Sequence, residues 1–119
     1  MRDFKKLVIW QNGMDLVEKV YKVVALLPVD ERYGLKAQAS RAAVSIVLNI
    51  AEGSAKSSKK EYRMYLSNSL GSAFELETVL LIVQRLALVD TQVVDPLLED
   101  ILKEQKMINS YINKLSSDG

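Results

Sequence analysis

Apolar residues recur at alternating intervals of three and four along separate segments of this chain. This spacing is typical of helices that pack in a bundle, because it keeps one face of each helix apolar. The segments cover residues 7–27, 35–51, 59–86 and roughly 91–115, and short connections join them. No stretch shows the alternation of a strand. The 119 residues are therefore predicted to be all-α, a single domain over residues 1–119 folded as an antiparallel up-down-up-down four-helix bundle.

Two predicted helices carry more apolar surface than one seam needs. Residues 7–27 have two adjacent stripes, and residues 79–83, VLLIV, are apolar on every side. The first stripe, which has the spacing of a seam, is Leu7, Trp10, Met14, Val17, Tyr21 and Val24, and the second is Leu16, Val20, Val23 and Leu27. The third seam is Tyr62, Leu66, Ser69, Ala73, Leu76, Leu80 and Val83, and the fourth is Val94, Leu98, Ile101, Gln105, Ile108, Ile112 and Leu115. A helix that is apolar all round is buried all round, so we expect self-association.

Residues that stop or cap helices predict the boundaries. Gly53 is expected to end the second helix. Ser58, with a glutamate three positions later, has the spacing of a capping box and predicts the start of the third helix. The fourth helix has two possible starts. Either Thr91 is the N-cap and Pro96 a tolerated kink, or Asp95 is the N-cap and Pro96 takes the first helical position.

The composition argues against catalysis. The sequence has no Cys and no His, which removes thiolate chemistry and the commonest general base and metal ligand. Di-metal sites in bundles pair glutamates with histidines, so Glu52, Glu61, Glu75 and Glu77 cannot assemble the usual site. The segment EGSAKSSKK lacks the spacing of a phosphate-binding loop. We therefore predict a protein that is not an enzyme and has no cofactor and no metal.

Charge and hydropathy bear on location and partners. The net charge is only +1, so any nucleic acid must be bound by a local patch of charge. The first ten residues, MRDFKKLVIW, lack the long apolar run of a signal peptide, and no charge-free apolar stretch reaches 18 residues. We expect a soluble cytoplasmic protein with no membrane partner.

A strip of polar residues runs along one side of the second predicted helix. It consists of Gln38, Arg41, Ser45, Asn49 and Glu52. If the second and third helices fold back on each other, this strip meets Ser72 and Glu75. Such a strip is a solvated face, a buried network or a binding surface. We favour a structural polar layer over a ligand site, with the Arg41 guanidinium within hydrogen-bonding distance of Glu75 or a neighbouring group on the third helix.

A cluster of positive charge follows that helix. Lys56, Lys59, Lys60 and Arg63 lie within eight positions. Lysines keep loops solvated, which is a sufficient structural reason for them. However, cations near a helix N-terminus oppose its dipole, and exposed amides there bind phosphate. The cluster is therefore our candidate contact for RNA or DNA.

These residues carry a resemblance. The chain resembles the four-helix-bundle family of proteins encoded in intervening sequences of 23S ribosomal RNA genes, to which the accessory variability proteins of diversity-generating retroelements are related. The similar segments are FKKLVIWQ, Tyr21, Pro28, ERYGL, QASRAAVSIVLNIAEGSAKSSKKEY and GSAFELET. The sequence departs from the family pattern at Ala39-Ser40 and at Val47, where a bulkier or basic residue and a proline are more usual. The missing basic residue weakens the case for nucleic acid along that face.

The resemblance implies a closed bundle that assembles into a ring, commonly a homopentamer. In the retroelement branch the ring is strongly basic and works with a reverse transcriptase and RNA, which the near-neutral charge of this chain matches poorly. Two hypotheses follow. The first is an oligomeric accessory module that binds RNA or DNA through residues 56–63. The second is a structural scaffold whose surplus apolar surface recruits a protein partner.

Overall fold

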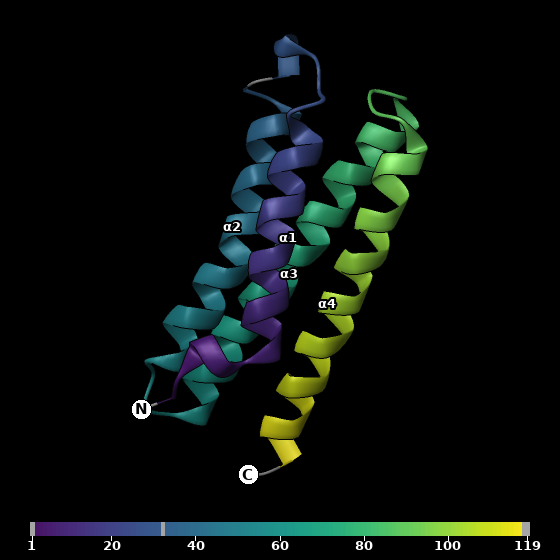
Figure 1. Ribbon diagram of the computed structural model, residues 1–119. Helices are drawn as coiled ribbons and strands as arrows, with labels where there is room; N and C mark the ends of the chain where they lie inside the picture. The colour runs from purple at the N-terminus through teal and green to yellow at the C-terminus, as the bar shows by residue number, and fades with distance from the viewer. Residues whose placement is uncertain (1, 32, 118–119) are drawn as a thin grey trace.

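The chain forms a bundle of four long helices, seen in a computed structural model that describes residues 2–31 and 33–117 (Figure 1). The helices are α1 (Val8–Val24), α2 (Leu35–Ser54), α3 (Lys59–Arg85) and α4 (Thr91–Ser117), and two short 3-10 turns are η1 (Phe4–Lys6) and η2 (Val29–Glu31). Successive helices run in opposite directions, and α4 packs against α1 to close the bundle. The predicted all-α four-helix bundle is confirmed.

The bundle places four chain segments at one end. The turn η1, the start of α1, the α2–α3 connection and the last turns of α4 all lie at the lower end in Figure 1. The α1–α2 and α3–α4 connections lie at the opposite end, along a molecule whose long axis is 46 Å. This topology brings residues more than fifty positions apart into contact.

Gly53 does not end α2, contrary to the prediction. The helix continues through it to Ser54, and Gly53 is buried where α2 and α3 come closest. A Cβ on Gly53 would lie 2.7 Å from the Tyr65 Cβ and 3.2 Å from the Tyr62 Cδ1. Glycine is therefore required here for close helix packing rather than for a left-handed cap.

The two later helices begin at side-chain caps. The Ser58 hydroxyl accepts a hydrogen bond from the Glu61 backbone amide at 3.1 Å, which confirms the predicted N-cap of α3. Of the two starts considered for α4, the earlier is nearer, but its cap is Asp90, which accepts from the Gln92 amide at 2.8 Å. Pro96 lies inside α4.

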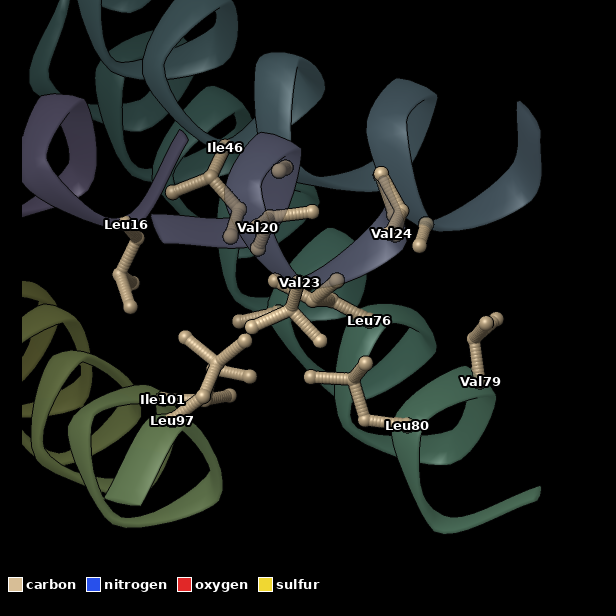
Figure 2. Close-up of a cluster of buried hydrophobic side chains, with 14 of the residues drawn as sticks. Leu16, Val20, Val23, Val24, Ile46, Leu76, Val79, Leu80, Leu97 and Ile101 are labelled. Carbon is tan, nitrogen blue, oxygen red and sulfur yellow. The ribbon is translucent and has the colours of Figure 1, made fainter. Parts of the chain in front are cut away.

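The core-facing stripe of α1 is the second of the two stripes in the sequence. Leu16, Val20, Val23 and Leu27 are buried, whereas Met14 and Tyr21 of the first stripe are exposed. The expectation that the first stripe forms the seam is wrong because both stripes are apolar and spacing does not rank them. Figure 2 shows α1 residues of this core meeting the three other helices at Ile46, Leu76, Val79, Leu80, Leu97 and Ile101.

The predicted seam of α3 is buried along its whole length. By length and composition alone α3 is also a candidate membrane span, but the core helix of a soluble protein meets the same criterion. Of residues 79–83, Leu81 and Ile82 keep 44% and 40% of their surface exposed. The seam of α4 includes two buried residues that the spacing did not indicate, Leu97 and Glu104.

Candidate nucleic-acid interface

The basic cluster lies at the end of the bundle where α2 passes into α3. Lys56 is in the connection, and Lys59, Lys60 and Arg63 are in the first turns of α3. Lys59 and Lys60 are exposed, and Arg63 is half-buried. The Ser58 cap and the acidic Glu61 satisfy the start of the helix, so the lysines are not needed to cap it.

Lys56 is held from both sides. Its ammonium lies over the Tyr65 ring, 5.0 Å from the centroid, a distance at which a cation is attracted to the ring face. Its backbone carbonyl accepts a hydrogen bond from the Arg2 guanidinium. Arg2 and Lys56 also line an open hollow with Ser54, Ala55 and Ser57. The connection is therefore tied to the N-terminal segment.

The fold adds positive charge that the spacing of residues along the chain does not reveal. Residues 2–6, 52–63 and 106–117 meet at this end and contain nine basic residues against three acidic ones. The basic residues are Arg2, Lys5, Lys6, Lys56, Lys59, Lys60, Arg63, Lys106 and Lys114. The other half of the bundle, residues 17–44 and 73–103, contains seven basic and nine acidic residues. Charge is thus segregated along the bundle axis, and the up-down topology would have been the signal for it.

The two tyrosines near the cluster are occupied within the protein. Tyr62 is fully buried, and its hydroxyl donates to the Tyr111 hydroxyl at 3.1 Å. The Arg2 guanidinium covers its ring at 4.2 Å from the centroid. Burial, followed by the hydrogen bond to Tyr111, raises the pKa of Tyr62. Tyr62 is a core residue that cannot stack on a base, and the Tyr65 ring is covered by Lys56.

The structure assembles only the middle of the predicted polar layer. The Ser45 and Ser72 hydroxyls lie 2.8 Å apart, and the Asn49 amide donates to the Ser45 carbonyl at 2.9 Å and to its hydroxyl at 3.1 Å. These three half-buried residues join α2 to α3.

The ends of the predicted layer are solvent-exposed. Gln38, Arg41, Glu52 and Glu75 all have exposed side chains. Within residues 2–31 and 33–117, Arg41 makes no hydrogen bond or ion pair, so the predicted contact with Glu75 or its neighbours is wrong. Arg41 lies on the outer face of α2, in an open groove with Tyr21, Val44 and Leu48. One turn of helix separates Arg41 from Ser45, and the residues turn outward over that distance.

Nothing in this geometry resembles a catalytic or metal centre. Within the part of the chain that the structure describes, no group of three His, Cys, Asp or Glu side chains could hold a metal ion. The arrangement at the basic end offers charge and hydrogen-bond donors at the surface. Such groups bind anions and do not by themselves provide a nucleophile or a general base.

Comparison with known proteins agrees with this description. A crystal structure of a protein with unknown function from the S23 ribosomal protein family of Bacteroides thetaiotaomicron superposes with a TM-score of 0.81 over 88% of this chain and 98% of that chain, at 21% sequence identity. That similarity shows the shared fold. The comparison with curated proteins finds no match. The family described as 23S rRNA-intervening sequence protein matches residues 5–110. The chain belongs to the family of 23S rRNA-intervening sequence proteins.

Proposed function

We propose that the protein is a non-enzymatic cytoplasmic module that assembles with itself and binds RNA through the basic end of its bundle. The observation that carries this proposal is the gathering of nine basic and three acidic residues from three chain segments at one end. Phosphate contacts by Lys and Arg supply most non-specific affinity for nucleic acid. A ring of copies would repeat the patch, so avidity compensates for a net charge of +1. DNA is bound by the same contacts if only charge is recognised.

The binding of a labelled single-stranded RNA of mixed sequence tests this proposal. In the loop variant, Lys56, Lys59, Lys60 and Arg63 are all changed to Ala, and we expect its affinity to fall by at least tenfold. The matched control changes Lys22, Lys36, Arg41 and Arg85 to Ala, which removes the same charge from the other half of the bundle. The control variant is expected to keep most of its affinity. Equal decreases in the two variants would contradict a local interface.

A second candidate function, a scaffold for protein assembly, is favoured by the outer face of α3. Met64, Phe74 and Leu81 lie on that face with 53%, 51% and 44% of their surface exposed. Their spacings of ten and seven place them on one side of the helix, away from the buried seam. A row of large exposed apolar side chains marks a protein contact. A second copy of this chain, or a different protein, is the expected partner.

Light scattering on the purified protein tests assembly. The wild-type mass is expected to be a multiple of 13.4 kDa, and five copies would agree with the ring that the family resemblance implies. Phe74→Glu places a charge within the apolar row and is expected to lower the mass. Gln38→Glu, at an exposed position on α2, is the control. A wild-type monomer at micromolar concentration would contradict both assembly and the avidity argument.

A further inference from the structure

Glu104 is the one charged type of side chain in the buried core of the described residues. Its exposed fraction is 0%, and neither carboxylate oxygen has a hydrogen-bond partner in residues 2–31 and 33–117. Buried polar groups are almost always hydrogen-bonded, and an exception calls for an explanation. Replacing such a residue with an apolar one of similar size is often stabilising. Glu104 therefore costs stability in the closed bundle.

Glu104 lies at the seam between α1 and α4, opposite a residue with no side chain. A Cβ on Gly13 of α1 would lie 3.0 Å from the Glu104 Oε2 and 2.6 Å from the Val47 Cγ1. Gly13 therefore leaves the space that the carboxyl group and Val47 occupy. Glycine inside a helix costs roughly 0.5–1 kcal/mol relative to alanine, so the pair Gly13–Glu104 combines two unfavourable choices at one level of the seam.

Weak polar contacts close the seam above and below this level. Lys19 of α1 pairs with Asp100 of α4 at 2.8 Å, with side chains 53% and 40% exposed. Exposed pairs of this kind contribute little. The Asn12 amide donates to the Met107 thioether at 3.5 Å, and thioether sulfur is a weak acceptor. These contacts leave the seam easy to open.

A polar groove runs along the outside of the seam, at the same level as Glu104. It encloses about 90 Å³ and is lined by Asn12, Asp15, Leu16, Lys19, Asp100, Lys103 and Met107. Its lining on α4 lies one residue before Glu104, and one turn on either side of it. A rotation of Glu104 outward therefore carries its carboxylate towards water and two lysines. The groove is large enough to hydrate a carboxylate.

The charges that face this level come from three helices. α1 presents Asp15 and Lys19, and α4 presents Asp100 and Lys103. α3 contributes Glu77, which accepts a hydrogen bond from Gln105 at 2.8 Å. α2 contributes the apolar Ile46 and Val47 beside Gly13. None of these groups is bonded to the carboxyl of Glu104, and desolvation by burial raises its pKa to about 8. The buried side chain is therefore a neutral acid at neutral pH.

We propose that the α1–α4 seam is a proton-controlled joint, which Glu104 keeps closed while it is protonated and opens when it ionises. Ionisation inside the closed bundle would leave a charge without a partner, which strongly disfavours the closed state in an apolar environment. Opening replaces that environment with water, Lys19 and Lys103. The proposal concerns the bundle itself and does not depend on RNA binding.

The distance between α1 and α4 as a function of pH tests the joint. Because the sequence has no Cys, spin labels can be placed at chosen sites without removing native thiols. We would label Glu18→Cys on α1 and Glu99→Cys on α4, both at exposed positions. Labelled protein is diluted with unlabelled protein, so that only distances within one chain are measured. Between pH 6 and pH 9.5 the distance distribution is expected to shift to longer values, with a midpoint near pH 8.

Two controls separate the joint from general loosening. A second label pair, Gln38→Cys on α2 and Glu75→Cys on α3, is expected not to change over the same range. In the labelled α1–α4 pair, Glu104→Gln removes the titrating group and is expected to abolish the shift. If that variant does not fold, Glu104→Met serves the same purpose. A wild-type distance that stays constant, or an equal shift in the Glu104 variant, would overturn the proposal.

Discussion

Gly53 sets how closely the end of α2 approaches the start of α3. Its missing side chain leaves space that the tyrosines of α3 fill, with the Tyr65 Cβ at 2.7 Å from where a Cβ would be. Gly71 on α3 is different, because a Cβ there would meet nothing within 4 Å. Two glycines in helices thus have opposite requirements, which their sequence context does not reveal.

We expect Gly53→Ala to destabilise the protein by about 1–3 kcal/mol, because an added methyl group overpacks a tight contact. Gly71→Ala is the matched control and is expected to stabilise it by about 0.5–1 kcal/mol, since alanine is the better helix former and has open space there. Urea unfolding followed by circular dichroism measures both. A Gly53→Ala variant as stable as Gly71→Ala would show that the α2–α3 contact is looser than described.

Glu104 makes stability depend on pH in a defined direction. Burial raises its pKa from 4.5 to about 8 in the folded protein. Between these values the folded state holds a proton that the unfolded state has released, so stability falls as pH rises. Below a pH of 4.5 the carboxyl group is neutral in both states, and its full contribution to stability is present.

The unfolding free energy of the wild type, relative to Glu104→Gln, is expected to fall by about 1.4 kcal/mol per pH unit between about pH 5 and pH 8. Above about pH 8 the difference is expected to level off. Urea titrations at unit pH intervals measure this difference, and comparison with the variant removes the contribution of other groups. A difference that is constant with pH would mean that Glu104 titrates normally and is hydrated in the folded state.

At the scale of single elements, α3 depends on its first turn. The Ser58 hydroxyl caps the Glu61 amide at 3.1 Å and also donates to the Glu61 carboxylate at 3.2 Å. The preceding Ser57 is exposed. The same turn carries Lys59 and Lys60, so the cap orders the segment that presents the basic residues.

Ser58→Ala is expected to cost about 1 kcal/mol of stability, because it leaves a helix N-terminal amide without its acceptor. Ser57→Ala is the control and should change stability by a few tenths of a kcal/mol. Thermal and urea unfolding of the two variants are the measurements. Equal effects of the two substitutions would mean that the Ser58 cap does not stabilise α3.

The helices themselves were predictable, because spacing and caps are local properties of the sequence. The seam of α3 and the Ser58 cap are confirmed in the structure. The choice between the two stripes of α1 was not predictable, because it depends on which partner helices cover each stripe. Arg41 was misplaced for a related reason: pairing by position puts it level with α3 but does not say that it turns outward.

Burial of Glu104 was also beyond the sequence, since a glutamate in a four-helix pattern is ordinarily a surface residue. The basic end was only partly predicted. The cluster at residues 56–63 is visible in the chain, but Arg2, Lys5 and Lys6 join it only once η1 is placed beside the α2–α3 connection. Long-range placement of this kind needs the assembled bundle.

At the scale of the whole molecule, charge is the property that best distinguishes the two ends. Nine basic residues against three acidic ones gather at the end formed by the α2–α3 connection, while the other half of the bundle is slightly acidic. Because the net charge is +1, only this local excess can attract a polyanion. Binding that depends on it must weaken as salt screens and replaces the contacts.

The salt dependence of RNA affinity therefore tests the central claim most directly. The logarithm of the association constant is expected to fall linearly with the logarithm of salt concentration for the wild type. Changing Lys56, Lys59, Lys60 and Arg63 to Ala is expected to reduce the steepness by up to about three, because each phosphate that a single strand no longer has neutralised accounts for roughly 0.7 of the slope. An affinity that does not change with salt, or a slope that is the same in the loop variant, would contradict an RNA interface at this end of the bundle.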